Sequence, residues 1–276
     1  MNLNKEEKVH SPFNYKILSY NVRVFNLWNW SPDKDRSRRI YDFIRKSNAK
    51  IVCLQEFYSK KDIGKNAKDS ILTQSRLKSS HIVYTTIKGE KTSFGIATFT
   101  AFPIFNRGSV QMKAEDNYCI YSDIIIEKDT IRIYNIHLES IHLGEKDYRL
   151  IDGFNSNDTI DVKGLKNIFW KFKKSYKKRA LQVNSIVDHI KTCRYPVILC
   201  GDFNDTPYSY VYGQLSSFLT DAFRISGHGI GYTYINKYPA FRIDYILHSS
   251  ELKSFGFKSQ KIKLSDHYPV ECNFEN

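Results

Sequence analysis

Short apolar runs recur along the whole of this 276-residue sequence, and they limit its fold more than any other feature. Each run has the length and composition of a buried strand, and turn-forming residues separate it from the next. The segments that fit this description are 16–22, 51–56, 81–86, 94–100, 118–127, 130–138, 196–200, 232–235, 242–248, 255–262 and 268–274. Residues 127–130 predict a hairpin turn between two of these strands.

Fewer segments have the spacing of a helix. In residues 33–47 the apolar Ile40, Phe43 and Ile44 have helical spacing, with charged residues between them. Ser31-Pro32 suits a helix start. Further helices are predicted at 69–79, 165–191 and 208–217, whereas the polar segment 139–159 predicts a loop. Many strands with a few helices between them predict an α/β (α+β) fold, in which two sheets pack together with helices outside. Without a linker or an internal repeat, residues 15–276 are predicted to form one domain after a flexible lead-in at 1–14.

Charge and cysteine usage bear on the partner and the compartment. The formal net charge of +13 favours an anionic partner such as nucleic acid, phospholipid headgroups or another phosphate ester, although a Lys-rich surface can serve solubility alone. The five cysteines form no CxxC pair and mostly lie in apolar runs, which indicates buried thiols and a reducing compartment. No stretch reaches the roughly 18 apolar residues that span a bilayer. We expect a cytoplasmic monomer without an obligate protein partner, or a membrane-associated or exported protein if an anchor precedes this sequence.

Polar side chains end the predicted strands repeatedly. Asp202 and Asn204 follow the run 196–200, and both can point the same way because alternate residues of an extended chain share a face. The other strand-associated polar residues are Asn21, Glu56, His137, Asp244, Asp266 and His267. Each has an ordinary alternative, such as a turn, a cap, a solvated edge or a packed ring. Asp244 is the exception, since a carboxylate inside an apolar strand needs a partner.

One shared site explains these residues better than several coincidences do. Carboxylates, amides and two histidines without clustered cysteines suit a hard cation such as Mg²⁺ or Mn²⁺. Histidine, carboxylate and metal together suit the hydrolysis of a phosphate ester. The residue types therefore predict a metal-dependent phosphoesterase.

The ordered set of motifs resembles the endonuclease/exonuclease/phosphatase superfamily, the group with the deoxyribonuclease I-like fold. The motifs are Asn21, Leu54-Gln55-Glu56, His137-Leu138, Gly201-Asp202-Phe203-Asn204, Arg242-Ile243-Asp244-Tyr245 and Ser265-Asp266-His267. The resemblance runs from Asn21 to the end of the chain. It implies a four-layer α/β sandwich, with two mixed sheets face to face and helices on both outer sides.

The resemblance also implies a role for each matching residue. Glu56 is expected to be the principal metal ligand, with Asp266 near it and Asn21 completing the polar shell. His267 is expected to act as the general base or to hold a phosphoryl oxygen. Asp244 is expected to fix the tautomer of His267 and to raise its basicity through a hydrogen bond.

Five further residues complete the expected site. Asp202 is expected to orient or deprotonate the attacking water, and Asn204 to hold a phosphate oxygen. His137 is expected to stabilise the charged transition state or to protonate the leaving group. Arg23 and Arg242 are expected to bind the substrate.

The motifs narrow the substrate only in part. Abasic-site endonucleases follow the first-strand Asn with Asn-Gly, whereas Val22-Arg23 follows Asn21 here. Inositol 5-phosphatases carry Pro-x-Trp-Cys-Asp-Arg, which residues 239–244 do not match. The sequence therefore resembles general bacterial members, near the deoxyribonuclease-like and sphingomyelinase-like branches.

Two aromatic segments bear on the remaining choice. Residues 25–30 can stack on bases, enter a lipid interface or pack the first helix. Residues 169–179 mix aromatics with a basic run, which can follow a nucleic-acid backbone, lie on anionic headgroups or be a solvated helix face. The aromatic residues there are too close together for one core stripe, so some exposed aromatic surface is predicted. We expect a phosphodiesterase acting on nucleic acid, with a membrane-surface phospholipid or sphingomyelin phosphodiesterase and a catalytically silent binding module as alternatives.

Overall fold

The computed structural model describes residues 14–28, 30–60, 66–86, 92–112, 118–153, 161–235 and 241–275. The strands of the first sheet are β1 (Asn14–Asn21), β2 (Ile51–Lys60), β3 (Ser79–Thr86), β4 (Thr92–Thr100), β11 (Lys253–Ser259) and β12 (Val270–Glu275). The strands of the second sheet are β5 (Ile104–Ser109), β6 (Tyr118–Ile126), β7 (Asp129–His137), β8 (Val197–Asp202), β9 (Thr220–Asp221) and β10 (Asp244–His248). Their orders are β11-β12-β1-β2-β4-β3 and β5-β6-β7-β8-β10-β9.

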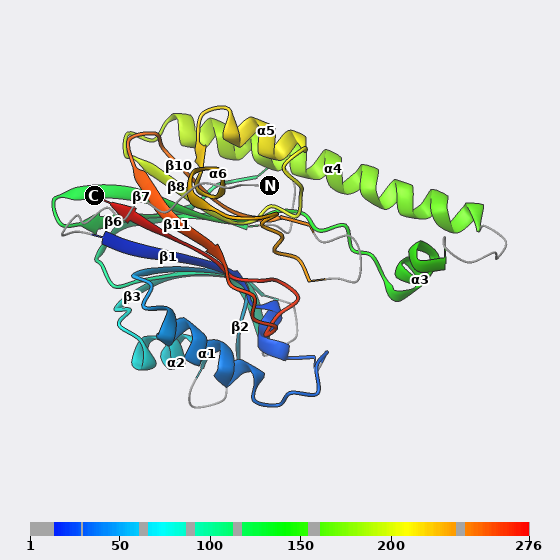
Figure 1. Cartoon of the computed structure of the whole chain (residues 1–276), viewed down its shortest axis with the longest axis horizontal. Helices are drawn as coiled ribbons and strands as arrows, with labels where there is room; N and C mark the ends of the chain where they lie inside the picture. The colour runs from blue at the N-terminus through cyan, green and yellow to red at the C-terminus, as the bar shows by residue number, and fades with distance from the viewer. Residues whose placement is uncertain are drawn as a thin grey trace.

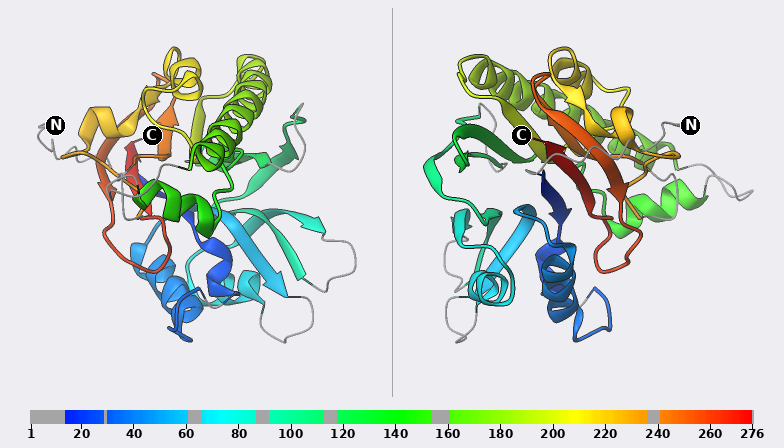
Figure 2. Two further views of the ribbon diagram at one scale, coloured as in Figure 1. Left: turned by 90° about the vertical axis from the view of Figure 1, so that its right-hand side faces the viewer. Right: turned by 60° about the vertical axis from the view of Figure 1, so that its left-hand side comes forward.

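Helices cover the outer faces of both sheets (Figure 1). Their bounds are α1 (Arg36–Ser47), α2 (Ala67–Gln74), α3 (Glu145–Gly153), α4 (Val162–Lys191), α5 (Tyr210–Ser216) and α6 (Ala222–Ser226), and a short turn, η1 (Arg23–Asn26), follows β1. α1 and α2 lie on the first sheet, and α4 and α5 lie on the second (Figures 1 and 2). The predicted four-layer sandwich of two mixed sheets is confirmed.

Burial on both faces explains why the central strands are continuously apolar instead of alternating. In β1, Ile17 faces the core between the sheets, whereas Leu18 and Tyr20 pack towards α1. On the second sheet, Tyr134 and Leu199 pack beneath α4. The cysteines behave as predicted, since all five are free thiols and four of them are buried.

Each sheet contains one parallel pair at its centre. β1 pairs with β2 in parallel, and β7 pairs with β8 in parallel. A parallel pair needs a crossover connection, and α1 and α4 lie in the two crossovers. Because both strands of a parallel pair run towards the same edge, the ends of β1, β7 and β8 and the neighbouring part of β2 are brought to one end of the sandwich.

Several elements differ from the sequence-based predictions. β5 was not predicted, because this edge strand carries exposed polar residues such as Asn106 and Arg107. α3 lies in the predicted loop 139–159, and the short β9 and α6 were missed. Residues 232–235, predicted as a strand, form only a single bridge between Tyr234 and His267. The predicted lead-in lies almost entirely outside the described residues.

Candidate active site

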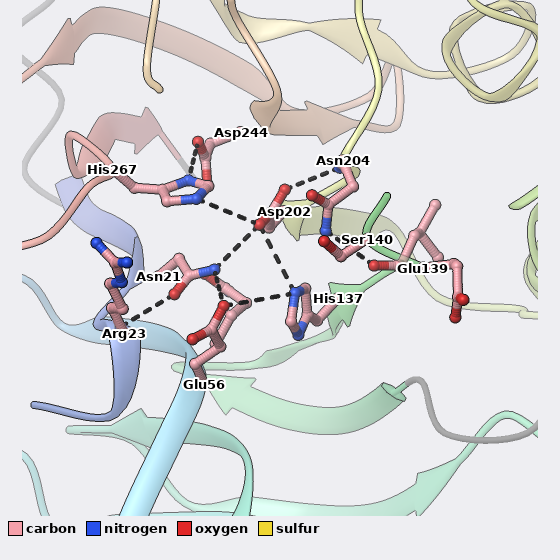
Figure 3. Close-up of polar contacts among 12 residues, drawn as sticks. Asn21, Arg23, Glu56, His137, Glu139, Ser140, Asp202, Asn204, Asp244 and His267 are labelled. Atoms are coloured by element: carbon pink, nitrogen blue, oxygen red, sulfur yellow. Dashed lines mark hydrogen bonds and ion pairs between the residues drawn. The ribbon is translucent and has the colours of Figure 1, made fainter. Parts of the chain in front are cut away.

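The carboxyl ends of the two parallel pairs place four predicted residues together. Asn21 ends β1, His137 ends β7, Asp202 ends β8, and Glu56 lies within β2 at an irregularity in its pairing with β4. Glu56 has a positive φ of 49°, so the irregularity turns its side chain away from the ordinary strand alternation. Figure 3 shows these side chains converging from both sheets.

Asp202 is the hub of this cluster and is almost fully buried (Figure 3). Its Oδ2 accepts a hydrogen bond from Asn21 Nδ2 at 3.0 Å and lies 3.7 Å from Nε2 of both His137 and His267. Its Oδ1 accepts the backbone N–H of Asn204 at 2.8 Å. The two 3.7 Å separations exceed hydrogen-bond length, so both imidazole Nε2 atoms can still bind a substrate oxygen.

His267 and Asp244 form the predicted pair. His267 Nδ1 lies 2.9 Å from Asp244 Oδ2, which leaves Nε2 directed towards Asp202. Burial alone would lower the pKa of His267, but the Asp244 and Asp202 carboxylates outweigh it and raise that pKa well above its usual range. For Asp202, burial has the opposite effect and raises the pKa, although the two facing histidines oppose this shift. The group therefore favours a proton on His267.

The loop that carries His267 is held by a segment that sequence reasoning assigned to a strand. Tyr234 bridges to His267 in the backbone, and the two rings meet edge to face at 5.2 Å. Thr233 Oγ1 accepts the backbone N–H of Asp244 at 3.1 Å. The same few residues thus fix both partners of the His267–Asp244 pair.

The predicted metal ligands offer oxygen atoms suited to a hard cation. Asp266 and Glu56 line one cavity, and both side chains are partly exposed to it. Among the described residues, no hydrogen-bond partner reaches Glu56 Oε2, so that oxygen can bind a cation. Asn21 donates Nδ2 to Glu56 Oε1 at 3.1 Å and accepts the backbone N–H of Arg23, so here it orients the carboxylates. This donor set fits Mg²⁺ or Mn²⁺.

Asp202, Asp244 and His267 also offer oxygen and nitrogen atoms within 4.8 Å of one another, as a metal site would. The hydrogen bond between His267 Nδ1 and Asp244 Oδ2 already occupies one atom of each of these two residues. A cation there would have to displace its proton. It therefore remains a prediction that these three residues handle protons and that Glu56 and Asp266 hold the cation.

The two predicted substrate-binding arginines have different positions. Arg23 lies at the site, where Nη1 is 3.2 Å from Asp266 Oδ2, and its guanidinium stacks on Trp30. The structure does not bring Arg242 there. Arg242, which lies just before β10, is buried and pairs with Asp221 at 2.7 Å, and its guanidinium packs on Tyr212 of α5 and Phe223 of α6.

Asn204 also differs in detail from its expected role. Its φ is 51°, and its Nδ2 donates to the carbonyl of Leu138 at 2.9 Å. The amide therefore ties the β8 loop to the end of β7 in this structure. Its contact with a phosphate oxygen remains a prediction.

A cavity of about 580 Å³ opens over these residues. Its lining includes Glu56, His137 and His267, together with Phe172 and Tyr176 of α4. Imidazoles, together with a cation held by the carboxylates, can bind an anionic group here, and the aromatic rings can contact an apolar or stacking group next to it.

The family model described as Endonuclease/Exonuclease/phosphatase family matches residues 18–267. The chain belongs to this family. Among solved structures, the human Nocturnin catalytic domain with bound sulfate anion is 17% identical, with 95% of this chain and 94% of that chain covered and a TM-score of 0.69. A family protein from Leptotrichia buccalis is 19% identical, with coverages of 95% and 100% and a TM-score of 0.66. Truncated Caenorhabditis elegans TDP2 is 14% identical, with coverages of 96% and 98% and a TM-score of 0.64.

At these identities the solved structures show the endonuclease/exonuclease/phosphatase fold alone. No curated protein matches the chain. Family membership supports a hydrolase that acts on phosphate esters. In the described part of the chain, no helix is both long and apolar enough to cross a membrane.

Sequence reasoning missed the residues that support this family site from behind. Arg179 is fully buried, donates to Asp205 Oδ2 at 3.0 Å and donates to the Glu139 carbonyl at 2.8 Å. It thereby joins α4 to the loops that follow β7 and β8. The sequence offers one clue, because Asp205 directly follows the Gly-Asp-Phe-Asn motif. Nothing in the basic run that ends at Arg179 shows that this one cation folds inward.

Proposed function

We propose that this protein is a metal-dependent phosphodiesterase, with nucleic acid as the favoured substrate class. The observation that supports it best is the position of Asp202 Oδ2, 3.7 Å from Nε2 of two histidines on the wall of an open cavity. Such a group can bind a phosphate and activate a water next to it. Family membership and the net charge of +13 agree with this assignment.

Three side chains divide the proton handling in the proposed reaction. His267, held through Nδ1 by Asp244, donates from Nε2 to a phosphoryl oxygen as negative charge develops there. Asp202 orients the attacking water and accepts its proton, and its raised pKa suits a base. His137, with Nε2 4.0 Å from Glu56 Oε1, lies where it can stabilise or protonate the leaving oxygen.

Glu56 and Asp266 would hold the cation, and Asn21 would keep the Glu56 carboxylate in place. When bound, Mg²⁺ or Mn²⁺ would neutralise charge on the phosphoryl oxygens and the leaving oxygen. Arg23, paired with Asp266, would keep this ligand oriented and add positive charge near the substrate.

The decisive experiment compares bis(p-nitrophenyl) phosphate with p-nitrophenyl phosphate in the presence of Mg²⁺ or Mn²⁺. Diester hydrolysis that EDTA abolishes, and that His267→Ala and Asp202→Ala lose without a change in fold, is the expected result. Monoester hydrolysis alone would instead indicate a phosphatase. Full turnover in both variants would overturn the assignment of these residues.

Small esters lack remote binding groups, so oligonucleotide and phospholipid substrates belong in the same experiment. Metal binding is followed separately by the melting temperature, which Mn²⁺ should raise in the wild-type protein and not in Glu56→Gln. A protein that binds Mn²⁺ through Glu56 and hydrolyses none of these substrates would favour the catalytically silent binding module.

A further inference from the structure

Half of α4 projects beyond the sheets and has a surface that the catalytic site does not explain. The carboxyl-terminal half packs on the second sheet through Val183, Ile186 and Ile190. The amino-terminal half extends past the end of the sandwich at which the catalytic residues lie, with α3 beside it (Figures 1 and 2). We call residues 162–178 the α4 arm. It extends roughly 25 Å along the helix axis.

Three aromatic side chains form a row on one side of the α4 arm. Phe169, Phe172 and Tyr176 are spaced i, i+3 and i+7, which places them on one helix face. Phe169 and Tyr176 are 62% and 49% exposed, and the rings of Phe172 and Tyr176 lie 6.1 Å apart at 34°. Phe172 and Tyr176 also line the catalytic cavity. The row therefore continues the cavity wall outwards, away from the catalytic residues.

A lysine surface flanks the aromatic row. The sequence 162–178 contains seven lysines and no acidic residue. Lys171 pairs with Asp147 at 2.5 Å, and Lys178 pairs with Glu139 at 2.8 Å. The other five are exposed and, within the part of the chain that the structure describes, form no ion pair: Lys163, Lys166, Lys173, Lys174 and Lys177. An anionic partner would neutralise this concentration of charge.

The geometry of the two rows favours a linear polyanion with accessible planar groups. Phe169 to Tyr176 covers roughly 10 Å of helix, which matches about three base steps of a nucleic-acid strand. Lysines beside the rings can contact phosphates while bases stack on the rings. Because bases in a duplex are already stacked and paired, rings on a helix surface can reach only unpaired bases.

The same surface is less suited to a bilayer. An interfacial helix separates a continuous apolar face from its charged face. Here Trp170, 51% exposed, lies within the lysine surface, with Lys173 Nζ 4.7 Å from its ring centre. We infer that the α4 arm binds a single-stranded polynucleotide, which runs from the catalytic cavity along the aromatic row with its phosphates against the lysines. This inference rests on the proposed phosphodiesterase function and names its substrate class.

Binding is measured by fluorescence anisotropy in EDTA, so that no turnover occurs. The probes are a fluorescein-labelled oligothymidine of about 15 nucleotides, the same strand in a duplex, and vesicles containing phosphatidylserine. The variants are Phe169→Ala and the double variant Lys173→Glu/Lys177→Glu. The matched control is Lys46→Glu/Lys68→Glu, which makes the same change in net charge on α1 and α2, across the molecule from α4 (Figure 1). Circular dichroism melting confirms that each variant is folded.

We expect the wild-type protein to bind the single strand more tightly than the duplex. Lys173→Glu/Lys177→Glu should raise the Kd for the single strand by about tenfold or more. It should also reduce the slope of log affinity against log salt concentration, measured between roughly 50 and 200 mM, by about 1.4. Phe169→Ala should raise the Kd for the single strand by about fivefold or more, and the control variant should bind the strand like the wild type. Quenching of tryptophan fluorescence by the strand should be reduced in Trp170→Phe, which reports contact independently of affinity.

Three results would overturn the inference. The control variant could lose as much affinity for the single strand as the arm variants do, or the protein could bind the duplex with an affinity that Phe169→Ala does not change. In the third, the arm variants lose affinity for the vesicles and keep their affinity for the single strand. The last would assign the α4 arm to a membrane. The proposed function fails separately. A protein that binds the strand through the arm but hydrolyses neither bis(p-nitrophenyl) phosphate nor the strand with Mn²⁺ would refute the phosphodiesterase and retain the arm.

Discussion

Asp244 is a buried carboxylate with one hydrogen-bonded oxygen and one unpaired oxygen among the described residues, and the unpaired oxygen lowers the stability of the fold. Its Oδ2 binds His267 Nδ1, and its backbone N–H donates to Thr233 Oγ1. Its Oδ1 is buried and, among the described residues, without a hydrogen-bond partner. Leaving a buried oxygen unpaired is unfavourable by about 1–3 kcal/mol. A residue retained at that cost is typical of a site selected for chemistry over stability.

Asp244→Asn should lower kcat by about 10- to 100-fold, because Asn cannot hold the charged form of His267 in the same orientation. The pH–rate profile should shift along with it, which a loss of packing alone would not cause. In a His267→Ala background the same change should have no further effect. Additive losses in the double variant would show that Asp244 does not act through His267.

Gly201 lies next to Asp202 near the end of β8, where the backbone requires glycine. Its φ is 142°, and a Cβ there would lie 2.0 Å from the Ile136 carbonyl oxygen in the parallel strand β7. Gly201→Ala should therefore lower the free energy of unfolding by about 3 kcal/mol or more in urea. Gly213 in α5 is the matched control, since nothing lies within 4 Å of its Cβ position. Gly213→Ala should be neutral or stabilising by up to about 1 kcal/mol.

At the scale of elements, the start of β10 and the residues just before it contact two different parts of the molecule. Asp244 at its start faces the active site, and Arg242 just before it faces the layer of α5 and α6. There Arg242 binds Asp221, which also accepts the hydroxyl of Tyr212 at 2.8 Å. The pair joins β10 to β9 and both helices, so it stabilises the strand that presents Asp244.

Arg242→Ala should destabilise the protein by about 3–5 kcal/mol, because it leaves Asp221 buried without its cation. KM for bis(p-nitrophenyl) phosphate, measured well below the melting temperature, should stay at the wild-type value. Thermal melting and steady-state kinetics on one preparation test both statements. A raised KM with unchanged stability would restore Arg242 as a substrate-binding residue.

At the scale of the whole molecule, polar contacts cross the interface between the two sheets. Gln55 Nε2 of β2 donates to Asn135 Oδ1 of β7 at 2.7 Å, directly behind Glu56 and His137. Near the edge, His81 Nδ1 of β3 lies 3.1 Å from Ser122 Oγ of β6. These contacts fix how one sheet lies on the other, and the site depends on that alignment because each sheet supplies part of it.

His81 makes this alignment sensitive to acid. Burial, assisted by the charge of Arg107, lowers its pKa from 6.5 to about 4. Between these values the unfolded chain binds the proton and the folded protein does not, so stability is full above pH 6.5 and falls towards pH 4. The loss attributable to His81 should approach about 1.4 kcal/mol per pH unit. His81→Asn should flatten the dependence of melting temperature on pH, and an unchanged slope would contradict this account.

The sequence by itself determined the layers and most members of the site. Apolar runs such as 196–200 predict buried strands because burial on both faces demands apolar side chains throughout. Polar residues that interrupt or end such runs, including Asp202 and Asp244, stand out for the same reason. Edge elements such as β5 and surface helices such as α3 carry mixed residues, which local pattern cannot distinguish from a loop.

Tertiary structure alone decided which polar residues meet. Asn21 and Asp202 are 181 positions apart, and they touch only because two parallel pairs in different sheets end at the same edge. Arg179 and Arg242 lie in basic or motif-like sequence, yet packing turns both inward to buried carboxylates. The direction of a side chain depends on what the fold places against it. Local sequence therefore predicts that a charge is present, and the fold determines whether it binds a substrate, a metal ligand or the core.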